Sequence, residues 1–220
     1  MTGRLTADGA ILLAGGSSSR MGEPKALFEV EGVPMLRRVL GVLQKSGIPE
    51  VVLCVRDNEQ GWGILGQLHI EQDDDGIFFM ESDGIPITMC PDIDIGDGGC
   101  SPAIGLMGGV LHAIDRGWQT VQVVPCDVPF LDSRLPSLLH SKLTTQLECV
   151  VPRSNHGLEP LLLCARSDAL KRATDDSQDS IHNIVAKMKS NEVGPSDWAV
   201  AGITDRCFTN VNSKDDLVRL

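Results

Sequence analysis

The sequence predicts a layered α/β domain built on a mostly parallel central sheet. Residues 10–14 and 51–55 are short, wholly apolar runs, which is typical of strands buried on both faces. The segment between them has apolar residues at helical spacing. A strand, a helix and a second strand in this order predict a parallel pair joined by a right-handed crossover. A length of 220 residues fits one such domain.

The remaining elements follow from the same patterns. Pro34 is at the first position of the helix between the two strands, and Gly47 lies beyond its end. Further strands are predicted at residues 87–90, 121–124, 149–151 and 161–164, with a short one near residue 200. Helices are predicted at residues 101–115, 133–143, 168–173 and 180–189, and Ser213 caps a last helix.

The stretch from residue 57 to residue 86 has no clear place in this scheme. Residues 73–76 read Asp-Asp-Asp-Gly, a turn signal, and residues 77–80 are apolar enough for one strand of a hairpin. We interpret residues 57–86 as an insertion peripheral to the main sheet. Since no repeat, low-complexity tract or linker interrupts the chain, residues 1–220 are predicted to form a single domain.

Composition excludes several classes of partner. The formal net charge is −11, which repels nucleic acid and anionic membranes, and the absence of Tyr argues against an aromatic platform for bases. No apolar run approaches the roughly 20 residues that cross a bilayer, and no signal peptide is apparent. Seven singly scattered cysteines, an odd number, favour a reducing compartment over a disulfide framework. We therefore expect a cytoplasmic protein.

Residues 13–25, LAGGSSSRMGEPK, form the first loop that carries chemistry. Gly15 and Gly16 let the backbone approach an anion closely, and the backbone N–H groups and hydroxyls that follow are donors. Arg20 and Lys25 add two positive charges, so the loop is suited to a triphosphate. It is neither a Walker A loop nor a dinucleotide-binding loop. A flexible serine-rich turn is the alternative.

Acidic residues follow two other predicted strands. Asp127 lies between Pro125 and Pro129, which present it stiffly at the ligand edge of the sheet. A hard carboxylate oxygen there suits Mg²⁺, although an N-cap or Asx-turn is the alternative. Asp92 has the same placement after its strand. Asp94 and Asp97 lie close to it, so the residue that contacts a nucleotide is open.

Two further segments are candidates for polar contacts. Asn210 and Asn212 flank Val211 at strand period, so both side chains are predicted to point to one side, toward a metal-bound water or a polar substrate edge. A turn before a helix cap is the alternative. The helix that starts at Ser101 presents free N–H groups that suit a phosphate or a base, and it contains a Gly108–Gly109 pair.

With these motifs in hand, the chain resembles the molybdenum cofactor guanylyltransferases (the molybdopterin-guanine dinucleotide biosynthesis protein A family) and their nucleotidyltransferase relatives. Residues 13–25 are similar to the phosphate loop of that family, and residues 125–129 to its metal-binding turn. Residues 208–217 resemble its closing motif, and residues 101–109 its helix start. The family tends to have Asn at the end of its second strand, where this chain has Cys54 or Val55.

The resemblance implies a three-layer, Rossmann-like fold of the nucleotide-diphospho-sugar-transferase type. It implies GTP and molybdopterin as substrates, Mg²⁺ as cofactor, and the guanine dinucleotide cofactor and pyrophosphate as products. Carried onto this sequence, the nucleotide contacts are Leu13, Ala14, Gly15 and, in the same loop, Gly16. Lys25 would contact the phosphates, Asp92 the nucleotide and Asp127 the magnesium.

Our hypothesis for the mechanism is direct displacement at the α-phosphorus by the phosphate of molybdopterin. Lys25 and Arg20 offset negative charge, and Asp127 anchors the metal. Two enzymatic alternatives stay open: a CTP-dependent cytidylyltransferase for the same pterin, and a transferase for another phosphate acceptor. A nucleotide-binding sensor without catalysis is the alternative from a different class.

Overall fold

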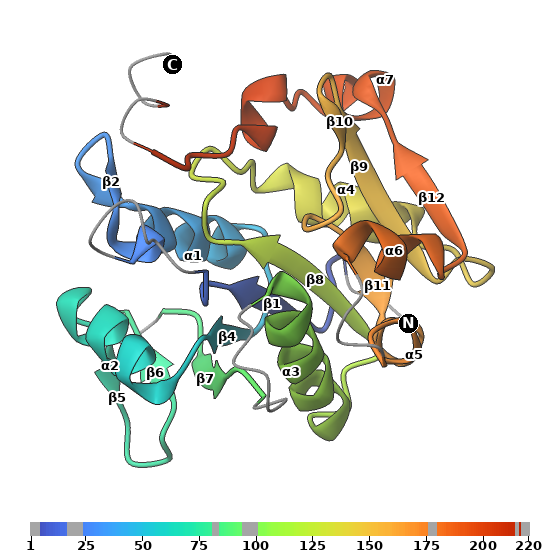
Figure 1. Ribbon diagram of the computed structural model, residues 1–220. Helices are drawn as coiled ribbons and strands as arrows, with labels where there is room; N and C mark the ends of the chain where they lie inside the picture. Colours follow the sequence, from blue (N-terminus) through green and yellow to red (C-terminus); the bar gives the residue numbers. More distant parts are fainter. Residues whose placement is uncertain are drawn as a thin grey trace.

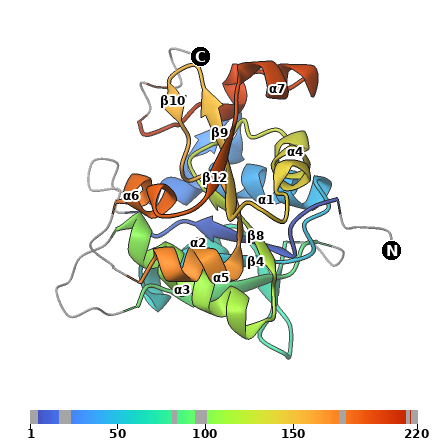
Figure 2. The ribbon, with the colours of Figure 1, turned by 90° about the vertical axis from the view of Figure 1, so that its right-hand side faces the viewer.

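The computed structural model describes residues 5–16, 24–80, 84–93, 101–175, 180–213 and 216. Its backbone forms a central sheet between two sets of helices, as Figures 1 and 2 show. The predicted α/β class is confirmed, and the centre of the sheet is parallel as expected.

The sheet has four parallel strands at its centre, in the order β8-β1-β4-β7. The strands of the described residues are β1 (Gly9–Leu13), β2 (Glu29–Val30), β3 (Val33–Pro34), β4 (Val51–Val55), β5 (Glu71–Gln72), β6 (Phe78–Phe79), β7 (Ile87–Pro91), β8 (Thr120–Pro125), β9 (Cys149–Ser154), β10 (Gly157–Leu158), β11 (Cys164–Arg166) and β12 (Ser190–Val193). Beyond β8, β11 runs antiparallel between β8 and β9, and β10 and β12 both pair with β9. Strands β2 and β3 form a separate hairpin.

Helices cover both faces of the sheet. They are α1 (Met35–Lys45), α2 (Asn58–Gln67), α3 (Pro102–Asp115), α4 (Arg134–Lys142), α5 (Ser167–Ala173), α6 (Ile181–Ala186) and α7 (Pro195–Val200), with 3₁₀ turns η1 (Lys25–Leu27) and η2 (Asp205–Phe208). Helices α1, α2 and α4 contribute to the buried cluster on one face, and α3, α5 and α6 to the cluster on the other. Figure 2 shows α1 and α4 across the sheet from α3 and α5.

Helix α1 forms where the apolar period predicted it. Its buried side chains include Leu36, Val39, Leu40 and Leu43, which recur at three- and four-residue spacing and face the sheet. The helix ends before Gly47, whose φ of +82° is a conformation that glycine adopts without strain. The crossover from β1 to β4 is therefore the predicted strand–helix–strand unit.

The segment expected as a peripheral insertion begins with a helix that the sequence pattern did not predict. Helix α2 connects the parallel neighbours β4 and β7 and buries Ile64 and Leu65 in the main core. Asp57 caps it by accepting a hydrogen bond from Gln60 N at 2.7 Å. The predicted hairpin is present: β5 pairs with β6, and β6 pairs with β7, at the edge of the sheet.

Two predictions near the C-terminus are wrong. The strand expected near residue 200 is helix α7, because Pro195 occupies its first turn and Asp197 Oδ2 accepts from the N–H of Gly194 at the N-cap. The strand of this region is β12, whose first three residues are exposed and polar, so it shows no apolar run. The strand expected at residues 161–164 starts only at Cys164.

Candidate active site

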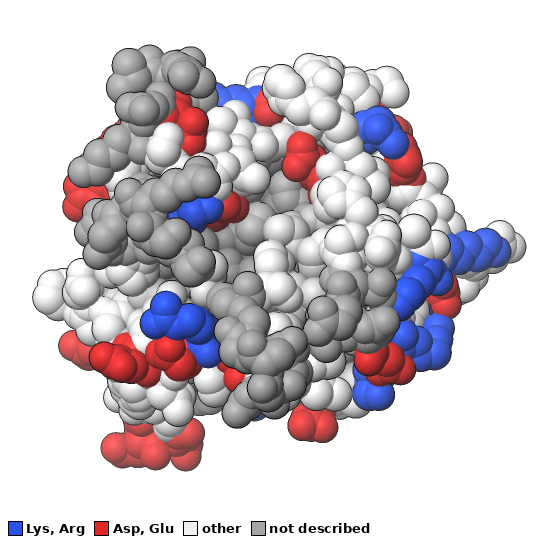
Figure 3. All heavy atoms as spheres, in the orientation of Figure 1, with Lys and Arg blue, Asp and Glu red and all other residues white. Residues whose placement is uncertain are grey.

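The carboxyl ends of the central parallel strands meet at one edge of the sheet, where open α/β sheets bind their ligands. A cavity of about 160 Å³ lies there. Its wall includes the turn after β1, the ends of β4 and β8, and the start of α3, through Leu13, Ala14, Gly15, Gly16, Lys25, Cys54, Asp92, Ser101, Gly105, Cys126 and Asp127. Figure 3 shows this side of the molecule hollowed at its centre, with a basic and an acidic group side by side on the wall of the hollow.

Lys25, Asp127 and Asn212 form a hydrogen-bonded cluster. Lys25 Nζ lies 3.5 Å from Asp127 Oδ2 and 2.5 Å from Asn212 Oδ1. Lys25 is the first residue of η1, whereas Asp127 follows β8. Both side chains are mostly buried, with 25% and 18% of their surface exposed. The sheet thus brings together three residues that the sequence separates into three motifs.

Asn210 and Val211 fasten the C-terminal segment to the turn that carries Asp127. The side-chain amide of Asn210, oriented so that its hydrogen bonds are satisfied, donates to Asp127 Oδ1 at 2.9 Å and to Asp127 O at 3.2 Å. Val211 N donates to the same carbonyl at 2.9 Å. The Asp216 carboxylate accepts from the N–H groups of Asn212 and Ser213, each at 2.8 Å. Asn210 therefore binds the Asp127 carboxylate, and Asn212 binds the Lys25 ammonium group beside it.

The Asp127 carboxyl is in an environment that favours a neighbouring cation. Burial raises the pKa of Asp127, and the Lys25 ammonium acts in the opposite direction. Within the described residues, no group of three or more His, Cys, Asp or Glu side chains is arranged to hold a metal ion by itself. Mg²⁺ usually binds through one or two carboxylates together with substrate phosphates, so a single buried Asp fits this mode of binding.

Asp92 lies on a different part of the cavity wall, directly after β7. Its backbone N–H donates to Val55 O at 2.7 Å. A Cβ atom at Gly105 would lie 3.1 Å from Asp92 Oδ1, and one at Gly15 would lie 3.0 Å from the backbone nitrogen of Arg56. The two glycines therefore have packing reasons to lack a side chain, and they keep the wall beside the Asp92 carboxylate open.

Helix α3 begins at the cavity. Ser101 caps it by accepting from Ile104 N at 3.4 Å, and Pro102 is its first residue. Ile104 N and Gly105 N both donate to Ser101, so the start of α3 contributes to the cavity wall through Ser101, Pro102 and Gly105. Of the Gly108–Gly109 pair, Gly109 serves packing, because a Cβ there would lie 2.5 Å from Ile11 Cγ2, whereas a Cβ at Gly108 would make ordinary contacts.

Three of the candidate residues predicted from the sequence lie outside the described residues: Arg20, Asp94 and Asp97. Sequence reasoning missed Leu161, which lines the cavity from the turn before β11. Leu161 belongs to a run of apolar residues, so nothing in the sequence distinguishes it as a residue of the cavity wall. His156 is exposed, with its Nε2 3.7 Å from Asp205 Oδ2, and it is not among the residues of the cavity wall.

The fold and the position of the cavity define an open α/β protein with a candidate ligand site at the carboxyl edge of its parallel strands. The family model described as the MobA-like NTP transferase domain matches residues 10–192, most of the chain. The protein therefore belongs to this family, which confirms the resemblance drawn from its motifs. No helix among the described residues has the length and apolar character to pass through a membrane.

Named relatives agree with the family over nearly full length. The chain is 24% identical over 213 residues to a probable molybdenum cofactor guanylyltransferase of Bacillus cytotoxicus, covering 96% of this chain and 94% of that protein. It is 28% identical over 213 residues to a protein of the same name from Pelotomaculum thermopropionicum, covering 95% and 89%.

Solved structures show the same fold. Molybdopterin-guanine dinucleotide biosynthesis protein A from Archaeoglobus fulgidus superposes with a TM-score of 0.68 at 19% identity, covering 96% of this chain and 95% of that chain. Rv0371c from Mycobacterium tuberculosis, in a complex with manganese, superposes with a TM-score of 0.59 at 15% identity, covering 86% and 88%.

Proposed function

We propose that the protein transfers GMP from GTP to the phosphate of molybdopterin, giving the guanine dinucleotide cofactor and pyrophosphate. One observation carries the proposal: Lys25 and Asp127 lie together on the wall of a cavity that the glycine turn after β1 also lines, and Asn212 holds Lys25 there. The names and near-complete coverage of the relatives support this choice of nucleotide and acceptor.

In this proposal the nucleotide lies between the glycine turn and the start of α3. Leu13, Ala14, Gly15 and Gly16 line that part of the cavity, and the glycines let backbone N–H groups approach phosphate oxygens. Asp92 contacts the nucleotide from the β7 side. Lys25 contacts the phosphates, and Arg20 adds a second cation from the same loop. These cations are local donors in a chain whose net charge of −11 would otherwise repel a triphosphate.

Asp127 is the residue proposed to hold the divalent metal, with Mg²⁺ as the cation. A bound divalent cation would neutralise charge on the triphosphate and orient it. Asn210 fixes the Asp127 carboxylate through Oδ1, and Asn212 holds Lys25 beside it. The two asparagines therefore act as positioning residues for the carboxylate and the ammonium group.

The reaction is a displacement at the α-phosphorus. An oxygen of the acceptor phosphate forms a bond to that phosphorus, the bond to the bridging α–β oxygen breaks, and pyrophosphate leaves with its electron pair. Lys25 and Arg20 offset the repulsion between the two anions and stabilise the charge that develops on the leaving group. No thiol nucleophile is required. Burial raises the pKa of the Cys126 thiol to about 12, so it stays protonated beside the site.

The test is pyrophosphate release by the purified protein with MgCl₂, GTP and molybdopterin, with the dinucleotide identified by mass. The proposal predicts release that needs both substrates, and no dinucleotide when CTP replaces GTP. Product with CTP alone would make the protein a cytidylyltransferase. Binding of GTP without turnover on molybdopterin or another phosphate acceptor would make it a nucleotide sensor.

We also propose that the protein works in the cytoplasm. Six cysteines of the described residues are free thiols, which supports a reducing compartment: Cys54, Cys90, Cys126, Cys149, Cys164 and Cys207.

A further inference from the structure

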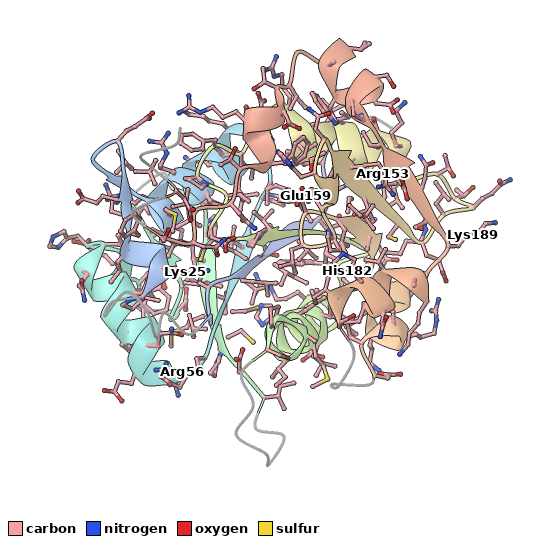
Figure 4. All side chains as sticks on the ribbon, turned by 45° about the horizontal axis from the view of Figure 1, so that its top comes forward. Lys25, Arg56, Arg153, Glu159, His182 and Lys189 are labelled. Carbon is pink, nitrogen blue, oxygen red and sulfur yellow. The ribbon has the colours of Figure 1, made fainter. Side chains whose placement is uncertain are left out.

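The segment from Ser154 to Leu162 reaches the wall of the site through Leu161. Figure 4 shows Lys25 in one half of the molecule and Glu159 in the other, above His182, with the ends of the central strands between the halves. Leu161, two residues after Glu159, lines the cavity itself. The segment therefore lies where a second substrate would extend away from the nucleotide.

The segment is held firmly at both ends. Asn155 N donates to Asp205 Oδ1 at 3.1 Å, and Glu159 N donates to Pro152 O at 2.9 Å. Leu162 is buried in the core, and its N–H donates to Glu159 O at 3.0 Å. Glu159 therefore projects from an anchored turn, so its direction is fixed before any ligand binds.

The Glu159 carboxylate is itself oriented. Ser154, whose side chain is buried, donates from Oγ to Glu159 Oε1 at 2.6 Å. The same Ser154 oxygen accepts from His156 N at 3.0 Å, and Gly157 O lies 3.3 Å from it as a second acceptor. The shorter, charge-assisted contact with Glu159 orients the hydroxyl toward the carboxylate. Glu159 makes no ion pair with a described cation. A half-buried carboxylate is thus held by one oxygen, while the second remains available to accept from a ligand.

A carboxylate at this place constrains the chemistry of the ligand. The site must admit a triphosphate and an acceptor phosphate, and Glu159 would repel either of them. The part of the acceptor that reaches Glu159 must therefore be uncharged and must carry N–H donors. The pyrimidinone edge of a pterin has a ring N–H and an exocyclic amino group side by side, and a carboxylate accepts from such a pair.

We propose that Glu159 recognises the amino–pyrimidinone edge of the acceptor's pterin ring and selects for it, with Ser154 as its positioning residue. This inference rests on the proposed function, because it takes the acceptor to be a pterin. It assigns the ring to the β9–β10 side of the site and the acceptor phosphate to the Lys25 side. Leu161 supplies an apolar surface beside the ring.

The principal experiment compares wild type with Glu159→Gln, using Glu71→Gln as the matched control. Gln keeps an oxygen that accepts from Ser154 but loses the charge, and Glu71 is an exposed residue of β5. Losing a charge-assisted hydrogen bond predicts a KM for molybdopterin that rises roughly tenfold or more in Glu159→Gln. The kcat and the KM for GTP should stay close to wild type. An unchanged KM for molybdopterin, in a variant that melts like wild type, overturns the inference.

A binding measurement separates this inference from the proposed function. Titration of pterin fluorescence needs no turnover, and it compares 6-hydroxymethylpterin with the corresponding lumazine, in which an oxygen replaces the 2-amino group. Wild type should prefer the pterin, and Glu159→Gln should lose that preference. Equal binding of the two rings by wild type overturns the inference even if guanylyl transfer occurs. Selective pterin binding without transfer would instead contradict the proposed function alone.

Discussion

Lys25 Nζ lies 3.5 Å from Asp127 Oδ2, although the two residues are 102 positions apart in the chain. The pair exists because β1 and β8 are parallel neighbours, so the loops that follow them leave the same edge of the sheet. In the absence of ligand each charge partly compensates the other. A nucleotide and a cation entering this site would replace that pairing with Lys25–phosphate and Asp127–metal contacts.

Lys25→Ala should reduce kcat/KM for guanylyl transfer by about 10²–10³-fold, the range observed when one stabiliser of developing charge is removed. The fold should persist, since Lys25 is at the surface of the cavity and not in a hydrophobic cluster. Steady-state pyrophosphate release measures the effect. Lys189→Ala, an exposed lysine on another part of the surface, is the control and should behave like wild type. Equal activity in both variants would contradict the phosphate role.

Asp127→Asn should abolish the dependence of nucleotide binding on a divalent metal. For wild type, Mg²⁺ and GTP at about 100 times Kd should stabilise the protein by roughly 2.7 kcal/mol, seen as a higher melting temperature. The variant keeps the size of the side chain and loses the charged ligand, so adding Mg²⁺ should give no further rise. Asp74→Asn, in an exposed turn, is the control. A full metal-dependent shift in Asp127→Asn would place the metal elsewhere.

Gly105→Ala should weaken GTP binding, because its Cβ would lie 3.1 Å from Asp92 Oδ1 and displace that carboxylate. We expect the KM for GTP to rise about tenfold, equivalent to roughly 1.4 kcal/mol. Gly66→Ala is the control: the same change in α2 meets no atom within 4 Å, so it should leave KM unaltered and stabilise the helix. Identical KM values for GTP in the two variants would contradict a contact between Asp92 and the nucleotide.

Cys126→Ala should retain activity within about threefold, and the pH profile of kcat should show no thiol ionisation between pH 7 and pH 9. Burial raises the pKa of Cys126 to about 12, so the thiolate that a nucleophile requires is absent over that range. Alkylation of the native protein at pH 8, followed by peptide mass analysis, measures its reactivity. Rapid alkylation of Cys126 together with loss of activity in Cys126→Ala would contradict direct displacement.

The sequence predicted which residues gather at the candidate site but not their hydrogen-bond partners. Buried apolar strands and the loops that follow them were sufficient to expect Lys25 and Asp127 at one edge, because parallel strands share that edge. The separate partners of Asn210 and Asn212 could not be predicted. The spacing of the two asparagines predicts that both side chains point to one side of the segment. Their hydrogen-bond partners depend on how the C-terminal segment crosses the turn after β8.

The elements that escaped prediction lacked the usual signals. Helix α2 contains three glycines and an exposed Trp62, so its apolar face is hard to recognise. Strand β12 is a polar partner of β9 without an apolar run. Leu161 looks like a strand residue and lines the cavity instead. In each case tertiary contacts, which a linear pattern does not contain, decided the outcome.

A crystal structure of the protein with Mg²⁺ and a non-hydrolysable GTP analogue tests the central claim most directly. We expect one nucleotide in the cavity after β1, with Lys25 on its phosphates and Asp127 as a ligand of the metal that those phosphates share. A nucleotide bound elsewhere, or a metal with no contact to Asp127, would contradict the claim.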